Sequence, residues 1–274
     1  MKRFCIIRNE QKDPGGRMGK KITRYLRSLG ASACVVTDEE DIDESAECLL
    51  VLGGDGTLLR AAHKAEKAQI PLLGINLGTL GYMAEVNRDS IRPALDQLLN
   101  DEYTVEKRMM LTGSVYHGGK KVCQRDALND IVISRGGLPS VIRFNNYVNG
   151  VYLNTYSADG IILSTATGST GYSLSAGGPI ISPTARMILM TPLAPHTINA
   201  RSIVFPETDD LMVEIGRSRT ELPETARVEF DGSDRIDVQT GDTIKVKKAS
   251  RYTRIIKISQ KSFLEILRDK FSSD

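Results

Sequence analysis

This sequence lacks an excess of charge of either sign. Lys and Arg number 36 against 34 Asp and Glu, so the formal net charge is +2 over 274 residues. A protein that holds nucleic acid through a strongly basic surface has a much larger positive excess. The balance therefore argues against nucleic acid as a partner, although it names no other partner.

A long apolar run is also missing. No uninterrupted apolar segment approaches the ~20 residues that a membrane-spanning helix needs. The N-terminal segment carries two positive residues, Lys2 and Arg3, but its apolar stretch meets charge again at Arg8, which argues against a leader peptide. We expect a soluble, cytoplasmic protein that does not use a membrane.

The cysteines lack the C-x-x-C spacing of common metal and redox motifs. The four cysteines are Cys5, Cys34, Cys48 and Cys123. Three of them lie in apolar stretches that are typical of buried strands. We therefore expect reduced cysteines in the core rather than a disulfide or metal framework, which agrees with a cytoplasmic location.

The first part of the chain alternates short apolar runs with helical patterns. Strands are expected at residues 4–7, 33–36, 49–52 and 70–75. Between the first two, apolar residues from Met18 to Leu29 recur at helical spacing, and Gly30 supplies a stop. A second helix is expected over residues 57–67. This alternation is typical of a parallel sheet in a Rossmann-like α/β domain, which we place at residues 1–100.

From about residue 111 the pattern changes to short β-rich segments between turns. Strands are expected at residues 128–134, 141–148, 151–156, 211–215, 226–230 and 243–247. Such spacing predicts an antiparallel, all-β sandwich domain, which we place at residues 101–254. The last residues carry apolar side chains from Phe263 to Phe271 at helical spacing. Residues 255–274 are therefore expected to return to the first domain and pack on it as a helix.

A glycine-rich run, Gly53-Gly54-Asp55-Gly56-Thr57, lies where an expected strand ends and a helix begins. Such a turn presents backbone N–H groups and the positive end of a helix to phosphate oxygens, so Gly53, Gly54 and Thr57 are candidate phosphate-binding residues. An acid beside phosphate is repulsive unless it holds a metal ion or takes a proton from an attacking hydroxyl. Asp55 is therefore the best catalytic candidate. A plain Asp-Gly tight turn is the alternative, and Walker A spacing is absent.

Two further features belong to the same edge of the expected sheet. Arg60, one turn into the helix, could reach a phosphate, although a solvated arginine would have the same sequence position. A second glycine-rich stretch over residues 74–83 follows the next strand and places Asn76 and Tyr82 near that edge. This stretch is either a ligand-binding loop or a turn that only packs.

A second segment, from Asp159 to Gly178, is rich in hydroxyl groups. It holds five Ser and Thr residues between Ser164 and Thr170, followed by Tyr172. Hydroxyls and backbone amides can satisfy sugar and phosphate oxygens, and the Tyr172 ring can stack on a base or a nicotinamide. A Ser/Thr-rich β-turn is the alternative.

Together these residues resemble the NAD kinases, which phosphorylate the adenosine 2′-hydroxyl of NAD to make NADP. The matching motifs span residues 53–232 in the family's order: 53–57, 76–82, 127–130, 159–160, 167–178 and 191–197. The first motif is shared with lipid kinases and phosphofructokinase relatives, whereas the run that begins at Thr167 is highly specific. The turn at Asp231-Gly232 also matches the family and either closes the dinucleotide site or is a plain hairpin turn.

The resemblance implies residue roles. It implies that Asp55 is the catalytic base, that NAD lies in a cleft between the two domains, and that the chain forms a homodimer or homotetramer. The phosphoryl donor would be ATP or polyphosphate, together with magnesium or another divalent cation. The implied NAD-binding residues are Asp55, Gly56, Asn129, Asp130, Asp159, Thr170, Gly171, Tyr172, Ser173, Leu174, Ser175 and Ala194.

The chain departs from the family pattern at three positions. Asp130 stands where the family commonly has Glu, Ala166 replaces a frequent Pro, and Gly171 replaces a frequent Ala. Two other functions remain open at this point. A lipid kinase shares the first motif but needs an apolar acceptor pocket, and a non-catalytic NAD(H)-binding sensor would act through a partner.

Overall fold

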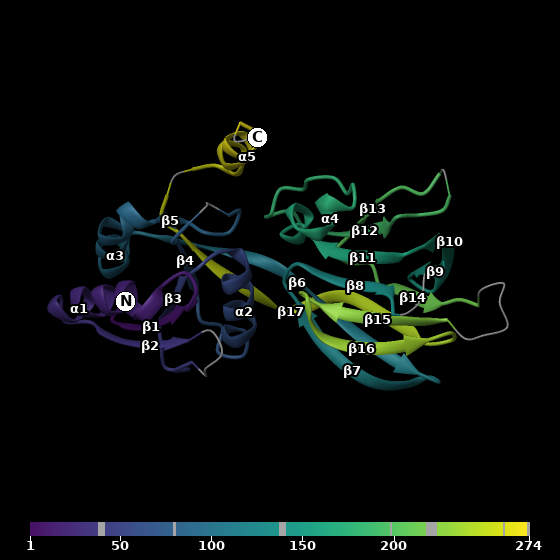
Figure 1. Ribbon diagram of the computed structural model, residues 1–274, viewed down its shortest axis with the longest axis horizontal. Coiled ribbons are helices and arrows are strands. Elements are labelled where there is room, and N and C mark those ends of the chain that lie inside the picture. Colours follow the sequence, from purple (N-terminus) through teal and green to yellow (C-terminus); the bar gives the residue numbers. More distant parts are fainter. Residues whose placement is uncertain are drawn as a thin grey trace. The chain divides into compact units, whose positions relative to one another are not determined.

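The computed structural model (Figure 1) describes residues 1–37, 42–78, 81–136, 141–197, 199–217, 224–259 and 261–272. The chain divides into two compact units, Met1–Arg108 with Tyr252–Asp274, and Met109–Arg251. We call the first the α/β unit and the second the β unit. Two long strands run from one unit into the other, β6 (Thr104–His117) and β17 (Thr243–Lys257).

The α/β unit alternates strands and helices along the chain. Its elements are β1 (Arg3–Arg8), the 3-10 helix η1 (Pro14–Gly16), α1 (Arg17–Ser28), β2 (Ser32–Thr37), β3 (Cys48–Leu52), α2 (Asp55–Ala65), β4 (Leu72–Asn76), β5 (Val86–Asn87), the 3-10 helix η2 (Arg88–Ser90), α3 (Ile91–Leu99) and α5 (Phe263–Phe271). The strands pair in parallel in the order β4-β3-β1-β2, with β5 beside β4. The end of β17 joins this sheet through Ile255, which pairs with Leu72 in parallel.

Helices cover both faces of the parallel sheet. Ile22 of α1 and Leu95 of α3 belong to one buried cluster together with Leu50 of β3. Gly74 lies between Leu73 and Ile75 in β4 and therefore faces the other side, where it lies against Leu58 of α2. Burial on both faces explains why β3 and β4 are apolar without alternation.

The β unit is a sandwich of antiparallel sheets. Its elements are β7 (Lys120–Ala127), β8 (Asp130–Arg135), β9 (Ile142–Val148), β10 (Val151–Ala158), β11 (Gly160–Thr165), the 3-10 helix η3 (Gly168–Thr170), α4 (Tyr172–Ser175), β12 (Met187–Leu193), β13 (Ile203–Pro206), β14 (Leu211–Ile215), β15 (Thr225–Phe230) and β16 (Ser233–Gln239). One sheet runs β10-β9-β14-β17, with β6 pairing β17 and β7, and the other runs β13-β12-β11-β8-β15-β16. Alternating strands from both sheets bury Phe144 and Phe230 in one core.

The C-terminal helix α5 belongs to the α/β unit. It begins with a capping box, in which the Ser262 hydroxyl accepts from the Glu265 amide and the Glu265 carboxylate accepts from the Ser262 amide. Ile266 is its buried apolar residue, whereas Leu264 and Phe271 are mostly exposed. The expected return of the C-terminus to the first domain is confirmed, although the helix buries less of its apolar face than its spacing suggested.

Most of the expected elements are present. The expected helix over residues 57–67 begins two residues earlier, at Asp55, because Gly54 takes the extended backbone of a helix N-cap. The hydroxyl-rich segment is not a β-turn, since it forms β11, η3 and α4. Additional elements that the sequence pattern did not indicate are α3, β6, β7, β11, β12, β13 and β16.

The cysteines are free, but they are not all in the core. Cys5 and Cys48 are buried, Cys123 is half-buried and Cys34 is exposed. Cys34 lies on β2, which ends the order of the parallel sheet and has one neighbouring strand there, β1. The expectation that cysteines in apolar stretches are buried was therefore wrong for Cys34.

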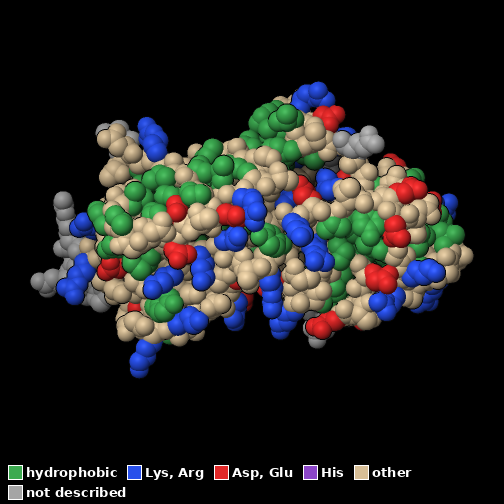
Figure 2. All heavy atoms as spheres, turned by 180° about the vertical axis from the view of Figure 1, so that it is seen from behind, with side chains coloured by type: hydrophobic (Ala, Val, Ile, Leu, Met, Phe, Trp, Pro, Cys, Tyr) green, Lys and Arg blue, Asp and Glu red, His purple; other side chains and the backbone are tan. Residues whose placement is uncertain are grey.

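The surface has no dominant charge sign on the face drawn in Figure 2. Lys and Arg side chains lie interspersed with Asp and Glu there, as the near-neutral composition indicates. Among the described residues no helix is both long and apolar enough to cross a bilayer.

The parallel sheet offers a test of the core. Leu50 is fully buried and Leu29 is 50% exposed. We expect Leu50→Ala to lower the free energy of unfolding by about 2–5 kcal/mol because it leaves a cavity. The matched control Leu29→Ala should cost no more than about 1 kcal/mol. Urea unfolding of both variants checks this, and equal losses would contradict the assigned core.

Candidate active site

Three loops gather at the carboxyl edge of the parallel sheet. Arg8 of β1 pairs with Leu52 of β3, and Leu52 pairs with Ile75 of β4, so these strands end at the same level. The loops that follow them begin at Asn9, Gly53 and Leu77. Ligands of open parallel sheets bind at this edge, which makes it the first place to look for chemistry.

The carboxylate of Asp55 is held by the loop that follows β4. Its Oδ2 accepts from the backbone N–H of Tyr82 at 2.8 Å, and its Oδ1 accepts from that of Met83 at 3.2 Å. A carboxylate offers about four acceptor sites. Both oxygens are therefore fixed in place and each can still accept another hydrogen bond. Asp55 and Tyr82, expected at the same edge, do meet there.

Glycines around Asp55 fall into two groups. A Cβ at Gly81 would lie 2.1 Å from Asp55 Oδ1, and one at Gly53 would lie 2.5 Å from the Thr57 hydroxyl. These two glycines are required by packing. A Cβ at Gly54 would meet nothing within 4 Å, and one at Gly56 would meet only Arg60 Nη1 at 3.9 Å. The protein itself leaves that space open.

The loop after β1 contributes residues that sequence reasoning missed. The Asn9 amide donates to the Thr57 hydroxyl at 3.3 Å, and the Asn9 side-chain oxygen accepts from the backbone of Lys12. The Lys12 ammonium lies 3.7 Å from the Cβ position of Gly78. A cation thus lies close to the glycine-rich loops. The signal available in the sequence was its place just after an expected strand.

The other candidates at this edge differ in exposure. Gly56 and Arg60 are exposed on the first turns of α2, whereas Thr57 is buried and its backbone N–H donates to the Gly54 carbonyl. Asn76 is buried, and its side-chain oxygen accepts from the Gly78 amide while its Nδ2 lacks a partner among the described residues. Thr79 and Leu80 of the same motif lie outside the described residues.

In the β unit, a single carboxylate organises the turn that carries Asn129 and Asp130. Asp231 accepts from the backbone N–H groups of Leu128, Asn129 and Asp130 at 2.7, 2.8 and 3.0 Å. Asp231 and Gly232 both have positive φ, as a tight hairpin turn between β15 and β16 requires. Asp231-Gly232 is therefore a hairpin turn, and it also positions two candidate residues.

Asp130 is buried and its acidity is altered. Burial, and to a smaller extent the charge of Asp231, raises the pKa of Asp130 from 3.8 to about 7. Beside it, the Asn129 side-chain oxygen is buried without a partner among the described residues. Ser164 lies directly opposite Asp130 where β11 pairs with β8, and its buried hydroxyl also has no hydrogen-bond partner among the described residues. Unsatisfied buried polar groups of this kind are costly, and each needs a partner such as an ordered water or a ligand.

The hydroxyl-rich segment packs directly on this turn. The Thr165 hydroxyl donates to the Leu128 carbonyl at 2.6 Å and accepts from the Gly168 amide. A Cβ at Gly168 would lie 2.1 Å from the Asn129 carbonyl oxygen. A Cβ at Gly171 would lie 3.3 Å from the Gly168 carbonyl, so the alanine common in the family would fit only with a small shift.

The residues from Thr170 to Ser175 point in different directions. The Tyr172 ring is 49% exposed and the Ser175 side chain is exposed, whereas Thr170 and Leu174 are half-buried. Ser173 is fully buried, and its hydroxyl pairs with that of Thr191 at 3.1 Å. Ser173 therefore attaches the segment to β12, whereas the exposed Tyr172 side chain can stack on a ring of a ligand.

Asp159 and Ala194 lie together, but away from Asn129 and Asp130. The Asp159 amide donates to the Leu193 carbonyl, and its carboxylate pairs with Arg135 at 3.2 Å. Asp159 directly precedes β11 and Ala194 directly follows β12, whereas Ser164, opposite Asp130, is five residues after Asp159. At ~3.3 Å per residue the two groups are separated by roughly 17 Å. Ala194 is exposed and has a positive φ.

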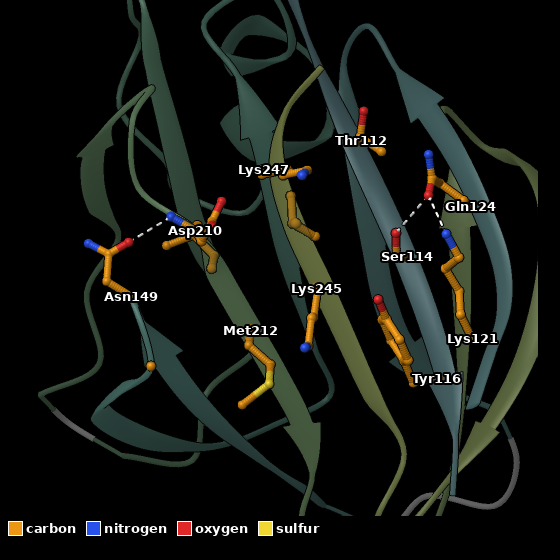
Figure 3. A pocket seen from close by; sticks show the side chains of 13 residues that line it. Thr112, Ser114, Tyr116, Lys121, Gln124, Asn149, Asp210, Met212, Lys245 and Lys247 are labelled. Carbon is orange, nitrogen blue, oxygen red and sulfur yellow. Dashed lines mark hydrogen bonds between the residues drawn. The ribbon is translucent and has the colours of Figure 1, made fainter. Parts of the chain in front are cut away.

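A hollow lies elsewhere in the β unit. Its volume is about 630 Å³, and its walls come from β6, β7, β14 and β17. Figure 3 shows Lys245 beside Tyr116, and Lys121 and Ser114 both bonded to Gln124. None of the residues predicted for the site lines this hollow.

A preformed metal site is not evident. Across residues 1–37, 42–78, 81–136, 141–197, 199–217, 224–259 and 261–272, no cluster of three or more His, Cys, Asp or Glu side chains could hold a metal ion. At the edge of the parallel sheet, Asp55 is the carboxylate that lies among the glycine-rich loops. Any cation there would need most of its ligands from a bound molecule.

Both units match known sequence families. Residues 16–103 match the model of the ATP-NAD kinase N-terminal domain, and residues 128–258 match that of the ATP-NAD kinase C-terminal domain. The NAD kinase of Lachnospira eligens is 46% identical and covers 98% of this chain and 100% of its own length. That of Agathobacter rectalis is 44% identical and covers 100% and 99%.

Solved structures agree on the fold. The crystal structure of yeast NADH kinase complexed with NADH superposes with a TM-score of 0.86 at 23% identity, covering 99% of this chain and 88% of that one. An NAD kinase from Archaeoglobus fulgidus in complex with ATP gives a TM-score of 0.80 at 24% identity, with 99% of each chain covered. The expected α/β domain and β sandwich are thereby confirmed.

The raised pKa of Asp130 predicts a pH-dependent stability. Between its ordinary pKa of 3.8 and about 7, the folded state binds more protons at this carboxyl than the unfolded state does. The folded protein therefore loses stability as pH rises through that window, by about 1.4 kcal/mol per unit. From pH 5 to pH 7 the loss should be about 2–3 kcal/mol relative to Asp130→Asn.

Urea unfolding of the wild type and Asp130→Asn at pH 5, 6, 7 and 8 measures the difference directly. The difference should change up to pH 7 and then level off. A difference in the free energy of unfolding that stays constant with pH would contradict the raised pKa of the buried Asp130 carboxyl. Asp237→Asn, at an exposed carboxylate, serves as the control.

Proposed function

This chain belongs to the NAD kinase family, and we propose that Asp55 is the base that accepts the proton of the ribose 2′-hydroxyl of NAD. The chain is a phosphotransferase that moves the γ-phosphoryl group of ATP to that hydroxyl and makes NADP. The finer assignments below concern the residues that do this, the cation, the assembly and the compartment.

The observation that carries the assignment is the fixed carboxylate of Asp55. Two backbone amides orient it, and each oxygen keeps acceptor capacity. A base must lie within hydrogen-bond reach of the proton it takes, in a defined direction. Holding the carboxylate by main chain rather than by side chains removes rotamer freedom before the substrate arrives, which favours the reactive geometry.

The phosphates of ATP are proposed to lie over Gly53, Gly54, Thr57 and Arg60. Gly54 and Gly56 leave open space beside the first turn of α2, where the helix dipole favours anions. Thr57 contributes by holding the turn through its bonds to Gly54 and Asn9. Lys12 adds a positive charge near the same loops. Phosphoryl transfer depends mainly on such positioning and charge neutralisation.

Magnesium, or another divalent cation, is proposed to arrive with the ATP phosphates. Magnesium is usually bound by one or two carboxylates plus substrate phosphates, and Asp55 is a carboxylate placed to fit that pattern. When bound, the cation would neutralise the phosphate charge. Polyphosphate presents the same chain of phosphates and is the alternative donor.

NAD is proposed to be held by residues of the β unit. These are Asn129, Asp130, Asp159, Thr170, Gly171, Tyr172, Ser173, Leu174, Ser175 and Ala194, together with Asp55 and Gly56 of the α/β unit. The unpartnered Asn129 oxygen and the buried Asp130 suit ribose hydroxyls, and the exposed Tyr172 ring suits nicotinamide. An extended dinucleotide would be needed to reach both Asp130 and Asp159.

A homodimer or homotetramer in the cytoplasm is proposed. The strand β10 carries the exposed apolar residues Val151, Tyr152 and Leu153 and ends its sheet, which supports burial against a second copy. The free thiols support a reducing compartment. The lipid-kinase and sensor alternatives gain no support, since the matched relatives are NAD kinases over nearly the whole chain.

Replacing the proposed base tests the assignment. We expect Asp55→Asn to fold, because its amide oxygen still accepts from one of the two loop amides while the other loses its acceptor. It should lose NADP production by roughly 10²–10⁴-fold or more. The assay measures NADP formed from NAD with ATP and Mg²⁺, and again with polyphosphate as donor. Circular dichroism and the melting temperature control for folding. Wild-type turnover in the purified variant would show that the base is wrong.

The open glycines give a second test. Gly56→Ala should stabilise α2 by about 0.5–1 kcal/mol, since alanine is the better helix residue, yet raise KM for ATP by about tenfold or more, because the methyl group occupies the phosphate space. Gly53→Ala is the contrast, since its Cβ would collide with Thr57, and it should lose stability as well. An unchanged KM for ATP in Gly56→Ala would count against the phosphate site.

A further inference from the structure

The α/β unit contains a buried carboxylate, Glu85, that the proposed reaction does not use. Its side chain is 2% exposed. Its Oε2 accepts from the Lys257 ammonium, and its Oε1 accepts from the Ile258 amide at 3.2 Å and from the Ser259 amide and hydroxyl at 2.8 and 2.6 Å. The carboxylate is thus fully satisfied by the end of β17 and the residues after it.

The same short segment holds Asp55. The amides that bond Asp55 belong to Tyr82 and Met83, which are three and two residues before Glu85. Met83 and Ala84, the two residues directly before Glu85, are both buried. The Glu85 amide donates to the Gly74 carbonyl at 3.0 Å, and a Cβ at Gly74 would lie 2.9 Å from Ala84 Cα. The end of the loop at Glu85 is therefore held on two sides, against β4 through its amide and against the C-terminal segment through its carboxylate.

The C-terminal helix contacts the loop at a second point. The Lys270 ammonium of α5 lies 5.5 Å from the centre of the Tyr82 ring, within the range of a cation–π interaction. Lys270 and the residues that bind Glu85 come from one segment of chain. Two contacts from residues 257–270 therefore lie on either side of the amides that orient Asp55.

We infer that Glu85 is a positioning residue for Asp55, and that the C-terminal segment of the chain completes the catalytic site through it. The inference rests on the proposed role of Asp55 as the base. A buried carboxylate that loses its charge, or its partners, leaves strong donors unpaired, and the loop then shifts to find others. A shift of the Tyr82 and Met83 amides releases the Asp55 carboxylate from its reactive direction.

The direct test is Glu85→Gln, which keeps the shape and removes the charge. We expect kcat to fall about 10- to 100-fold while KM for NAD changes less than about twofold, because a displacement near 1 Å is enough for such losses. Hydrogen exchange of the Tyr82 and Met83 amides, followed by mass spectrometry, should be about tenfold faster. A purely structural role would lower stability without this pairing of kcat and exchange.

Controls keep the outcome decisive. Lys261→Ala removes a cation of the same segment whose partner is the exposed Asp269, and it should leave kcat and exchange unchanged. Should Glu85→Gln fail to fold, Ser259→Ala is the milder change, because it removes only one of the four donors to Glu85, the Ser259 hydroxyl. In this variant kcat should still fall about two- to fivefold, with faster exchange at Tyr82 and Met83.

The failures are distinguishable. A folded Glu85→Gln, or Ser259→Ala in its place, with wild-type kcat or with unchanged exchange at Tyr82 and Met83 overturns the inference. If Asp55→Asn abolishes turnover in the same assay, the proposed base survives that result. If Asp55→Asn turns over normally, the proposed function of Asp55 fails and the inference fails with it.

Discussion

The hydrogen bonds from the Tyr82 and Met83 amides to Asp55 are the constraint on which the proposed catalytic edge of the sheet depends. They require β3 and β4 to be parallel neighbours, so that a loop from one strand can reach a helix that follows the other. They also require Gly81, because any side chain there would occupy the position of the carboxylate. The order of the strands, the start of α2 and the glycine at position 81 thus all help to place the Asp55 carboxylate against the two amides.

The β unit uses the same physical device for a different purpose. Asp231 accepts from three successive amides. Beside them the Asp130 carboxyl is buried, and the buried side-chain oxygen of Asn129 has no partner among the described residues. The turn at residues 128–130 is thus well ordered, but a buried side-chain oxygen on it is left unpaired. Asp231 orders the turn through its hydrogen bonds, and the neighbouring Asn129 and Asp130 side chains remain available to a ligand at a cost in stability.

Sequence reasoning reached the fold where periodicity is simple and failed where contacts are long-range. Continuous apolar runs identified β1 to β4, and glycine with acid identified Asp55. The long strands β6 and β17 mix charged and apolar residues along their length, so β6 was not expected and only residues 243–247 of β17 were. The roles of Asp231 and Glu85 depend on partners about 100 and 172 residues away, which no local motif encodes. Cys34 misled because an edge strand can be apolar and exposed.

The α/β unit is discontinuous in the chain, and this has a consequence for biosynthesis. Glu85 leaves the ribosome long before Lys257, Ile258 and Ser259, with the whole β unit made in between. Domains tend to fold as they emerge. The nascent α/β unit therefore lacks the partners of Glu85, and the loop that bonds Asp55 is not yet restrained by them. On the proposed role of Glu85, a chain gains the competence to phosphorylate only after residues 257–259 have been made, and a copy truncated before them is inactive.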